Sequence, residues 1–259
     1  MTSSPLAIRP EAGEAPSSGI VEVFSYARGR EGLIPLYVGE GDLPTPPFVV
    51  EAAQRSLAAG ETFYTYQRGI PELREAVARY HRRVWNVDVP VDRFTVTVGG
   101  MHATQIAMRM VAGTGDEVLI PSPAWPNFDG AARVAGALPV AVPLEIGPAG
   151  WRLNLERLAA AVTPATRAML INTPANPTGW TASREDLAGI LAIARRHGLW
   201  IVADEIYARF THDPAYVEAG RTPSFRDVME PGDRVMFVQT FSKMWAMTGW
   251  RIGWLETPA

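Results

Sequence analysis

One lysine stands out among the residues of this sequence that could do chemistry. Lys243 is the only lysine in the chain, and every other basic side chain is Arg or His. It ends the segment Gln239-Thr240-Phe241-Ser242-Lys243, directly after a strand-like apolar run. A lysine near a strand end can be desolvated, which lowers its pKa and frees the amine for Schiff-base chemistry. An ordinary surface lysine is the alternative, but any Schiff base in this chain must use Lys243.

A carboxylate follows a second apolar run. The segment Asp204-Glu205-Ile206-Tyr207 comes directly after 199–203, a run of Leu, Trp, Ile, Val and Ala. A carboxylate at the end of a buried strand is costly unless it has a partner, and a protonated ring nitrogen would be one. A helix N-cap is the other common place for an aspartate. Both interpretations of Asp204 stay open at this point.

Two turns and an arginine could bind a ligand. The run Asn172-Thr173-Pro174-Ala175-Asn176-Pro177-Thr178-Gly179 predicts a sharp loop, and its two amides could donate hydrogen bonds to a ligand hydroxyl. Val98-Gly99-Gly100-Met101 leads from a strand into a helix, where free N–H groups favour an anion. It matches neither the dinucleotide fingerprint nor the P-loop. Arg251 could bind a phosphate with two N–H groups, or could be a surface arginine.

Strands and helices alternate over most of the chain. The expected strands are 94–98, 117–120, 138–142, 168–172, 199–203, 234–239 and 252–255. The expected helices are 48–58, 71–85, 101–111, 128–135, 155–162 and 184–197. In the last helix, Leu187, Ile190, Leu191 and Ala194 share one face, with a Ser183/Asp186 capping box before it and Gly198 after it. This alternation predicts an α/β fold with a mostly parallel sheet.

The polar residues lie where such a fold binds ligands. In open α/β sheets, ligands lie beyond the carboxyl ends of the strands. The polar residues that follow the expected strands are Gly99 and Gly100, Ser122, 172–176, 204–207, and Ser242 with Lys243. We therefore expect these groups to converge at one edge of the sheet.

Composition excludes several function classes. A formal net charge of −3 without a basic cluster argues against nucleic acid as the main partner. The absence of cysteine excludes disulfides and zinc-thiolate sites, and it fits a reducing cytoplasm; no metal site is predicted. No apolar run is long enough for a membrane span, and Met1 to Ser18 is interpreted as a mobile arm and not as a signal peptide. His81, His197 and His212 are expected to be exposed and without a role.

Taken together, these motifs carry a family resemblance. The chain resembles the class I/II aminotransferases of pyridoxal-phosphate (PLP) fold type I, the aspartate-aminotransferase-like group. The resemblance covers about residues 20–255. It rests on Asn176-Pro177-Thr178-Gly179, Asp204-Glu205-Ile206-Tyr207, Ser242-Lys243, and 247–253, which reads Met-Thr-Gly-Trp-Arg-Ile-Gly. Two upstream segments agree, Gly39-Glu40-Gly41-Asp42 and 64–74, with Tyr64-Thr65 at its start.

The resemblance implies a role for each matching residue. Lys243 would hold PLP as a Schiff base and shuttle protons, Asp204 would pair with the ring nitrogen, and Tyr207 would bind the ring's phenolic oxygen together with Asn176. Trp125 would stack on the ring, and Gly39 would lie near the substrate carboxylate, so that Gly39, Trp125 and Asn176 would contact substrate. The phosphate would be held by Gly100, Met101, Thr240, Ser242 and Arg251. His102, in the same turn, is left open as a ligand contact.

The resemblance also implies an architecture. It predicts a three-layer α/β/α large domain with a mostly parallel seven-stranded sheet, plus part of a small α/β domain. Residues 1–44 would form an N-terminal arm and a small-domain segment, and residues 45–259 the PLP-binding domain. The peptide bonds Ser122-Pro123 and Asn176-Pro177 are predicted to be cis. Tyr64 would reach the PLP phosphate of a neighbouring subunit, so a homodimer is expected.

The implied activity is amino-group transfer between an L-amino acid and a 2-oxo acid. Another PLP reaction, such as C–S beta-elimination or cyclisation, remains open because the motifs do not choose the fate of the carbanion. A ligand-sensing domain without catalysis is a third possibility, although no basic helix-turn-helix pattern occurs in residues 1–45. Family members usually continue past the strand after Arg251 and supply an arginine for the substrate carboxylate. The sequence is therefore expected to be truncated or naturally short, and such a chain to be poorly soluble, to bind PLP weakly and to turn over slowly.

Overall fold

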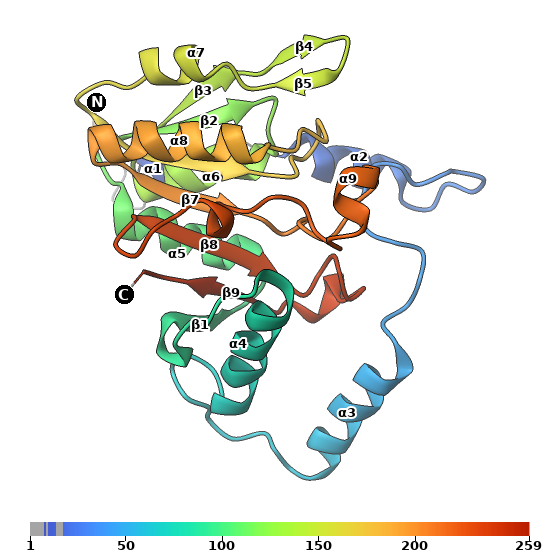
Figure 1. Cartoon of the computed structure of the whole chain (residues 1–259). Coiled ribbons are helices and arrows are strands. Elements are labelled where there is room, and N and C mark those ends of the chain that lie inside the picture. The colour runs from blue at the N-terminus through green and yellow to red at the C-terminus, as the bar shows by residue number, and fades with distance from the viewer. Residues whose placement is uncertain (1–7, 9, 14–17, 259) are drawn as a thin grey trace.

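A seven-stranded sheet forms the centre of the molecule (Figure 1). The computed structural model describes residues 8, 10–13 and 18–258. The strand order is β1-β9-β8-β7-β6-β2-β3, and only β9 runs antiparallel to its neighbours. The strands are β1 (Phe94–Thr97), β2 (Glu117–Ser122), β3 (Leu138–Pro143), β6 (Thr166–Asn172), β7 (Trp200–Asp204), β8 (Val235–Thr240) and β9 (Gly253–Glu256). The predicted mostly parallel sheet of seven strands is confirmed.

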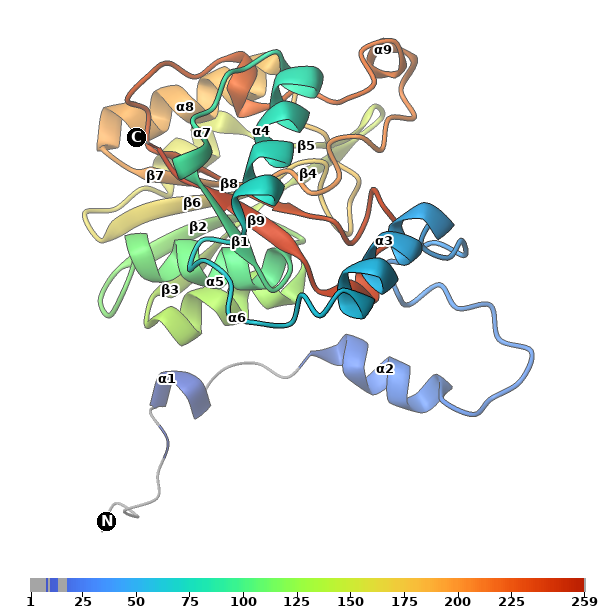
Figure 2. The same ribbon diagram turned by 90° about the horizontal axis from the view of Figure 1, so that it is seen from below.

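Helices cover both faces of this sheet (Figure 2). One layer holds α5 (Gly100–Val111) and α6 (Pro126–Ala135). The other holds α4 (Pro71–Trp85), α7 (Leu155–Ala160) and α8 (Arg184–His197). Alternate residues of the strands face the two layers: Val118 and Val202 pack with the α5–α6 layer, whereas Leu119 and Ile201 pack with the α8 layer. The three-layer architecture is confirmed.

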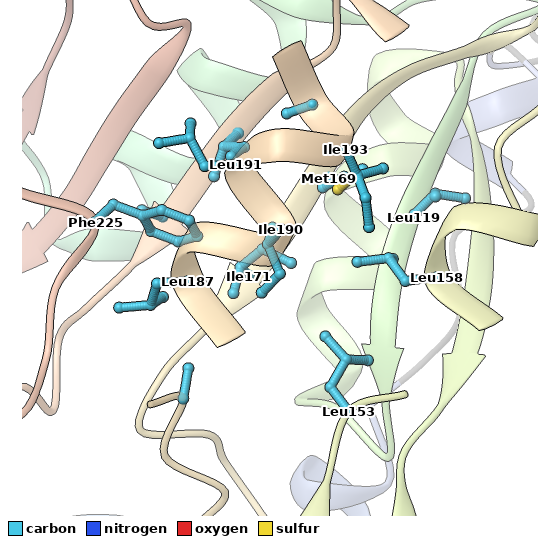
Figure 3. Close-up of a cluster of buried hydrophobic side chains, with 14 of the residues drawn as sticks. Leu119, Leu153, Leu158, Met169, Ile171, Leu187, Ile190, Leu191, Ile193 and Phe225 are labelled. Atoms are coloured by element: carbon cyan, nitrogen blue, oxygen red, sulfur yellow. The ribbon is translucent and has the colours of Figure 1, made fainter. Parts of the chain in front are cut away.

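Helix α8 shows how the local sequence sets these layers. Ser183 accepts a hydrogen bond from the backbone N–H of Asp186, whose side chain accepts one from the Ser183 N–H. Gly198 ends the helix in a left-handed conformation with φ of 68°. Between these caps, Leu187, Ile190 and Leu191 are buried against the sheet, together with Phe225 and Leu158 (Figure 3). The predicted Ser183/Asp186 capping box, the end of the helix at Gly198 and its buried apolar face are all confirmed.

Several smaller elements were not predicted. The helices are α1 (Pro10–Gly13), α2 (Gly19–Ala27) and α9 (Pro214–Val217), and a two-stranded ribbon joins β4 (Glu145–Gly147) to β5 (Gly150–Arg152). The 3₁₀ turns are η1 (Val91–Arg93), η2 (Phe225–Asp227) and η3 (Thr248–Trp250). Helix α1 falls inside the expected arm, most of which lies outside the described residues. These elements are too short for their periodicity to be recognised.

Helix α4 is anchored by a buried polar cluster that includes His81. The prediction that His81 is exposed is wrong, because its side chain is fully buried. The indole N–H of Trp254 donates to His81 Nε2 at 3.1 Å, and His81 Nδ1 lies 3.3 Å from Glu256. Arg226 binds the same carboxylate at 2.6 Å. Burial lowers the pKa of His81 to about 4, so the ring is neutral and joins α4 to β9 by hydrogen bonds.

The segment between residues 28 and 70 is mostly exposed. Helix α3 (Pro47–Ala58) has no buried residue and lies away from the sheet (Figure 1). Many of the most exposed large apolar side chains lie in the same part of the chain: Ile34, Leu36, Leu43, Phe48, Phe63 and Tyr64. Within the described residues, no helix is long and apolar enough to cross a membrane.

Candidate active site

The side chain of Lys243 lies beyond the carboxyl end of β8, where the N-terminal segment crosses the sheet edge. Its Nζ donates a hydrogen bond to the carbonyl oxygen of Gly39 at 2.6 Å. A Cβ at position 39 would lie 3.5 Å from that nitrogen, which is an ordinary contact distance. Burial lowers the pKa of Lys243, and the nearby Glu40 carboxylate partly opposes this. The amine is therefore more easily deprotonated than that of an ordinary lysine.

Asp204 ends β7 and is buried, with 2% of its surface exposed. The Asn172 amide donates to its Oδ1 at 3.1 Å, and the Ile206 N–H approaches the same oxygen at 3.4 Å. Residues 206–209 form a turn and not a helix, so the N-cap alternative is wrong. Burial raises the pKa of Asp204 to about 7, because the hydrogen bonds from Ile206 and Asn172 and the charge of Lys243 offset only part of the cost of desolvating the carboxylate.

Tyr207 and Asn176 come together from two different loops. Both line the cavity that also contains Lys243. Burial and the Asp204 carboxylate raise the pKa of Tyr207, while a hydrogen bond with the Asn176 side chain lowers it. The loop that carries Asn176 contains two cis prolyl bonds, Thr173-Pro174 and Asn176-Pro177. Ser122-Pro123 is also cis, so both predicted cis bonds are confirmed and that at Thr173-Pro174 was not foreseen.

A second group of side chains surrounds the start of α5. Thr240 Oγ1 and Ser242 Oγ lie 2.9 Å apart, and Arg251 Nη1 reaches Ser242 Oγ at 3.4 Å. Gly99, with φ of 79°, leaves the room that Arg251 occupies, because a Cβ there would lie 2.5 Å from Nη2. Two hydroxyls, a guanidinium and the free N–H groups of a helix N-terminus therefore converge on one spot. This is the donor set that a phosphate group requires.

A cavity of about 470 Å³ lies beside Lys243. Its polar lining includes Asn172, Asn176 and Tyr207, and its aromatic lining includes Trp125, which is edge-on to Phe128 with ring centres 5.4 Å apart. The lining from the N-terminal segment is mostly apolar: Ile20, Val21, Leu36, Tyr37 and Val38. A planar ring with polar substituents on its edge matches this combination of aromatic and polar side chains.

Comparisons with known proteins agree with this arrangement. Residues 31–259 match the family model described as aminotransferase class I and II. The chain belongs to this family. It is 37% identical to an aspartate aminotransferase of Pyrococcus horikoshii over 93% of this chain and 60% of that protein. It is 38% identical to aromatic-amino-acid aminotransferase 2 of Thermococcus litoralis over 93% and 61% of the two chains.

A solved aminotransferase structure shares the fold. The aspartate aminotransferase of Thermotoga maritima superposes with a TM-score of 0.89 at 34% identity, over 96% of this chain and 66% of that one. The chain thus spans about six tenths of the length of the curated relatives it matches. Within that span it contains the sheet and all the polar groups described above.

The family's cofactor, PLP, can be tested against these residues. Asp204 is a buried carboxylate without a cationic partner, and a protonated ring nitrogen would supply one. Lys243 offers an amine with a lowered pKa, and Trp125 offers an aromatic face. The donors around Gly99 and Arg251 suit a dianionic phosphate. The chemistry of each donor set fits PLP.

Most of the predicted site residues lie close together, but some do not. Tyr64 is fully exposed and lies outside this cavity. Met101, in the first turn of α5, packs against the buried α5–α6 layer, so it can offer its backbone N–H. The ring of His102 accepts a hydrogen bond from the Val98 N–H at 3.1 Å, which gives it a local structural contact.

Two features of the site were missed. Asn172 contacts both Asp204 and the loop of Asn176, whereas the sequence predicted it only as a donor to a ligand at the end of a strand. The signal for it was available, because Asn172 and Asp204 end neighbouring strands in register. The second is a set of contacts between 39–45 and 245–250. Thr248 donates to Glu40 at 2.9 Å, and the Trp250 indole donates to Thr45 at 2.9 Å. No local pattern predicts them, since these partners lie about 200 residues apart.

Proposed function

We propose that this protein is a PLP-dependent aminotransferase that moves an amino group between an L-amino acid and a 2-oxo acid, with Lys243 as the residue that holds the cofactor. The observation that carries the proposal is the convergence of the only lysine, Trp125 and Tyr207 around one cavity, next to the buried carboxylate of Asp204, which Asn172 of the cavity lining contacts. Relatives named for aspartate and for aromatic amino acids match almost equally well, so the amino acid is left unspecified.

When bound, PLP supplies an electrophilic carbon for the amino group and a ring that withdraws electrons from the substrate's alpha carbon. The Asp204 carboxylate holds a proton on the ring nitrogen, which requires Asp204 to be ionised. Its burial disfavours that charge until the cation arrives, so cofactor and carboxylate stabilise each other.

Lys243 moves the alpha proton. Its lowered pKa favours the neutral amine that can accept a proton from carbon at ordinary pH. The Asn176 amide and the Tyr207 hydroxyl hold the ring's phenolic oxygen, and Trp125 covers the ring face. Gly100, Met101, Thr240, Ser242 and Arg251 hold the phosphate through backbone N–H groups, hydroxyls and a guanidinium. Gly39, whose carbonyl oxygen accepts a hydrogen bond from Lys243, would lie near the substrate carboxylate.

The assembly and location are part of the same proposal. We expect a homodimer in which Tyr64 reaches the phosphate site of the partner subunit, since Tyr64 is too exposed to serve its own site. Residues 1–44 would move with the substrate as an arm and small-domain segment, and 45–259 would hold the cofactor. The amino acid and the 2-oxo acid are the small-molecule partners, and the enzyme would work in the cytoplasm.

The direct test uses the uniqueness of Lys243. Incubation with PLP should produce a visible absorbance band, and borohydride should fix the cofactor to the protein. Peptide mapping should then find the label on Lys243, because the N-terminal amine is the only other primary amine. Lys243→Ala should lose the band and lose oxo-acid formation with a panel of L-amino acids. Label on the N-terminal amine alone, or a Lys243→Ala protein that still transaminates, would overturn the proposal.

A further inference from the structure

The side chain of Asn172 links the two loops that carry the site. Its Nδ2 donates to Asp204 Oδ1 at 3.1 Å and to the Asp204 carbonyl oxygen at 3.2 Å. Its Oδ1 accepts a hydrogen bond from the backbone N–H of Asn176 at 2.8 Å. One amide therefore touches the carboxylate on one side and the loop of Asn176 on the other. Asn172 is 8% exposed, so water does not readily replace either contact.

The sheet explains why one side chain can make both contacts. Asn172 ends β6 and Asp204 ends β7, and the two residues are paired in register. The chain turns back after Asn172 through the loop 173–179, which brings the Asn176 N–H within reach. Only an amide of this length offers a donor toward the carboxylate and an acceptor toward the loop at once.

The contact also fixes which oxygen of Asp204 remains available. Among the described residues, Oδ1 receives the hydrogen bonds from Asn172 and Ile206, and none is made to Oδ2. Holding Oδ1 in this way prevents the carboxylate from rotating and leaves Oδ2 for a cationic partner. A hydrogen bond to the charged form also favours ionisation of the carboxylate.

We infer that Asn172 is a positioning residue for the proposed reaction, which fixes the Asp204 carboxylate in the orientation that holds the ring nitrogen and sets the Asn176 loop at the correct distance from it. The inference rests on the proposed function for its catalytic consequence. The orientation of the Asp204 carboxylate by Asn172 does not depend on the cofactor and can be tested in the apoprotein.

Two substitutions separate the contacts of Asn172. Asn172→Asp keeps the shape and an acceptor for the Asn176 N–H but removes the donor to Asp204. Asn172→Leu keeps the approximate size and removes both. Thr173→Val is the matched control, because Thr173 Oγ1 accepts from the Ala182 N–H at 2.9 Å and steadies the same loop without touching the Asp204 side chain.

The first measurement needs neither cofactor nor turnover. In apoprotein labelled with ¹³C-aspartate, the Asp204 carboxyl should titrate near pH 7, identified by its loss in Asp204→Asn. Asn172→Leu should move that midpoint about one pH unit or more higher, since a hydrogen bond to a charged group is worth roughly a factor of ten or more. Asn172→Asp should move it at least as far, because it loses the same hydrogen bond and adds the repulsion of a second carboxylate. Thr173→Val should leave it in place. An unchanged midpoint in both Asn172 variants overturns the inference.

The second measurement tests the catalytic consequence. Both Asn172 variants should lower kcat about tenfold to a hundredfold while KM changes less than about threefold, because the substrate still binds but the ring nitrogen loses its partner. Wild-type kcat in Asn172→Asp with a loss only in Asn172→Leu would mean that Asn172 merely holds the loop. A shifted Asp204 midpoint in a protein that never binds PLP on Lys243 would contradict the proposed function and leave the Asp204–Asn172 contact standing.

Discussion

Asp204, which the proposed function pairs with the ring nitrogen of the cofactor, carries an unfavourably buried charge. It makes no ion pair within the described residues, and burial raises its pKa to about 7. Proteins rarely keep such a group unless it serves a ligand, because desolvating a charge is costly. The burial of the Asp204 carboxylate therefore supports the proposed cofactor site. It also predicts how the stability of the apoprotein depends on pH.

Asp204 should make the stability of the apoprotein depend on pH. Its folded-state pKa of about 7 lies above the ordinary value of 3.8, so between these pH values the folded state binds more protons than the unfolded chain. The contribution of this group to stability therefore falls as pH rises from about 4 to about 7, by at most roughly 1.4 kcal/mol per pH unit. We predict that Asp204→Asn becomes progressively more stable than the wild type across this window.

Urea unfolding of both apoproteins at several pH values measures this difference directly. Comparison with the variant cancels the opposite slope from His81, whose lowered pKa makes stability fall as pH drops below about 6.5. A constant difference between the two proteins from pH 4 to pH 7 would contradict the assignment of a raised pKa to Asp204. Saturating PLP should reduce the slope of the wild type, since the ring cation compensates the carboxylate.

At the scale of elements, the proposed phosphate site depends on how closely β9 approaches the start of α5. Gly253 begins β9, and a Cβ there would lie 2.6 Å from the Gln239 carbonyl oxygen and 3.0 Å from the Gly100 nitrogen. Both are backbone atoms, so a side chain cannot be accommodated without moving β8 or the turn before α5. Gly253 therefore permits the close approach of β9, the strand that follows Arg251, to the N-terminus of α5.

We predict that Gly253→Ala destabilises the protein by about 1–3 kcal/mol and weakens PLP binding at least about tenfold. Gly130→Ala is the control, because Gly130 lies within α6 and a Cβ there meets no atom within 4 Å. That substitution should be neutral or stabilise by up to about 1 kcal/mol. Urea unfolding and titration of the visible absorbance band measure the two effects. Normal PLP affinity in a folded Gly253→Ala protein would show that the close approach of β9 does not shape the phosphate site.

At the scale of the whole molecule, residues 28–70 carry apolar surface that the chain itself does not cover. Leu36, Phe63 and Tyr64 are each at least 87% exposed, and α3 has no buried residue. Several exposed large apolar side chains in one segment are a common feature of protein interfaces. A two-fold dimer would bury the same segment of both copies at once.

Subunit complementation can test whether Tyr64 serves the neighbouring site. Lys243→Ala and Tyr64→Ala should each be impaired alone. In a mixed dimer, one site would carry both defects and the other would have an intact Lys243 together with an intact Tyr64 from its partner. We therefore predict that mixing the two variants under subunit exchange restores activity, up to half the wild-type rate per dimer. A mixture no more active than the sum of the separate variants would mean that Tyr64 acts within its own subunit or not at all.

The sequence determined the α/β class, all seven strands of the main sheet and the two longest helices. These follow from local patterns: an apolar run of the right length, a capping box such as Ser183/Asp186, a stop such as Gly198. It also identified Lys243, Asp204, Asn176 and Tyr207 as a group, because residues that follow parallel strands meet at one edge of the sheet.

Only the tertiary structure decided which of these residues touch, and how. The hydrogen bonds of Asn172 to Asp204 and to the Asn176 loop depend on the register of β6 with β7. The burial of His81 depends on Trp254 and Glu256, more than 170 residues away, although on α4 alone it looks like an exposed helix residue. The contacts of Glu40 and Thr45 with 245–250 span about 200 residues. Local periodicity has no information at such separations, because contacts of this range form only when distant strands and loops are brought together by the fold.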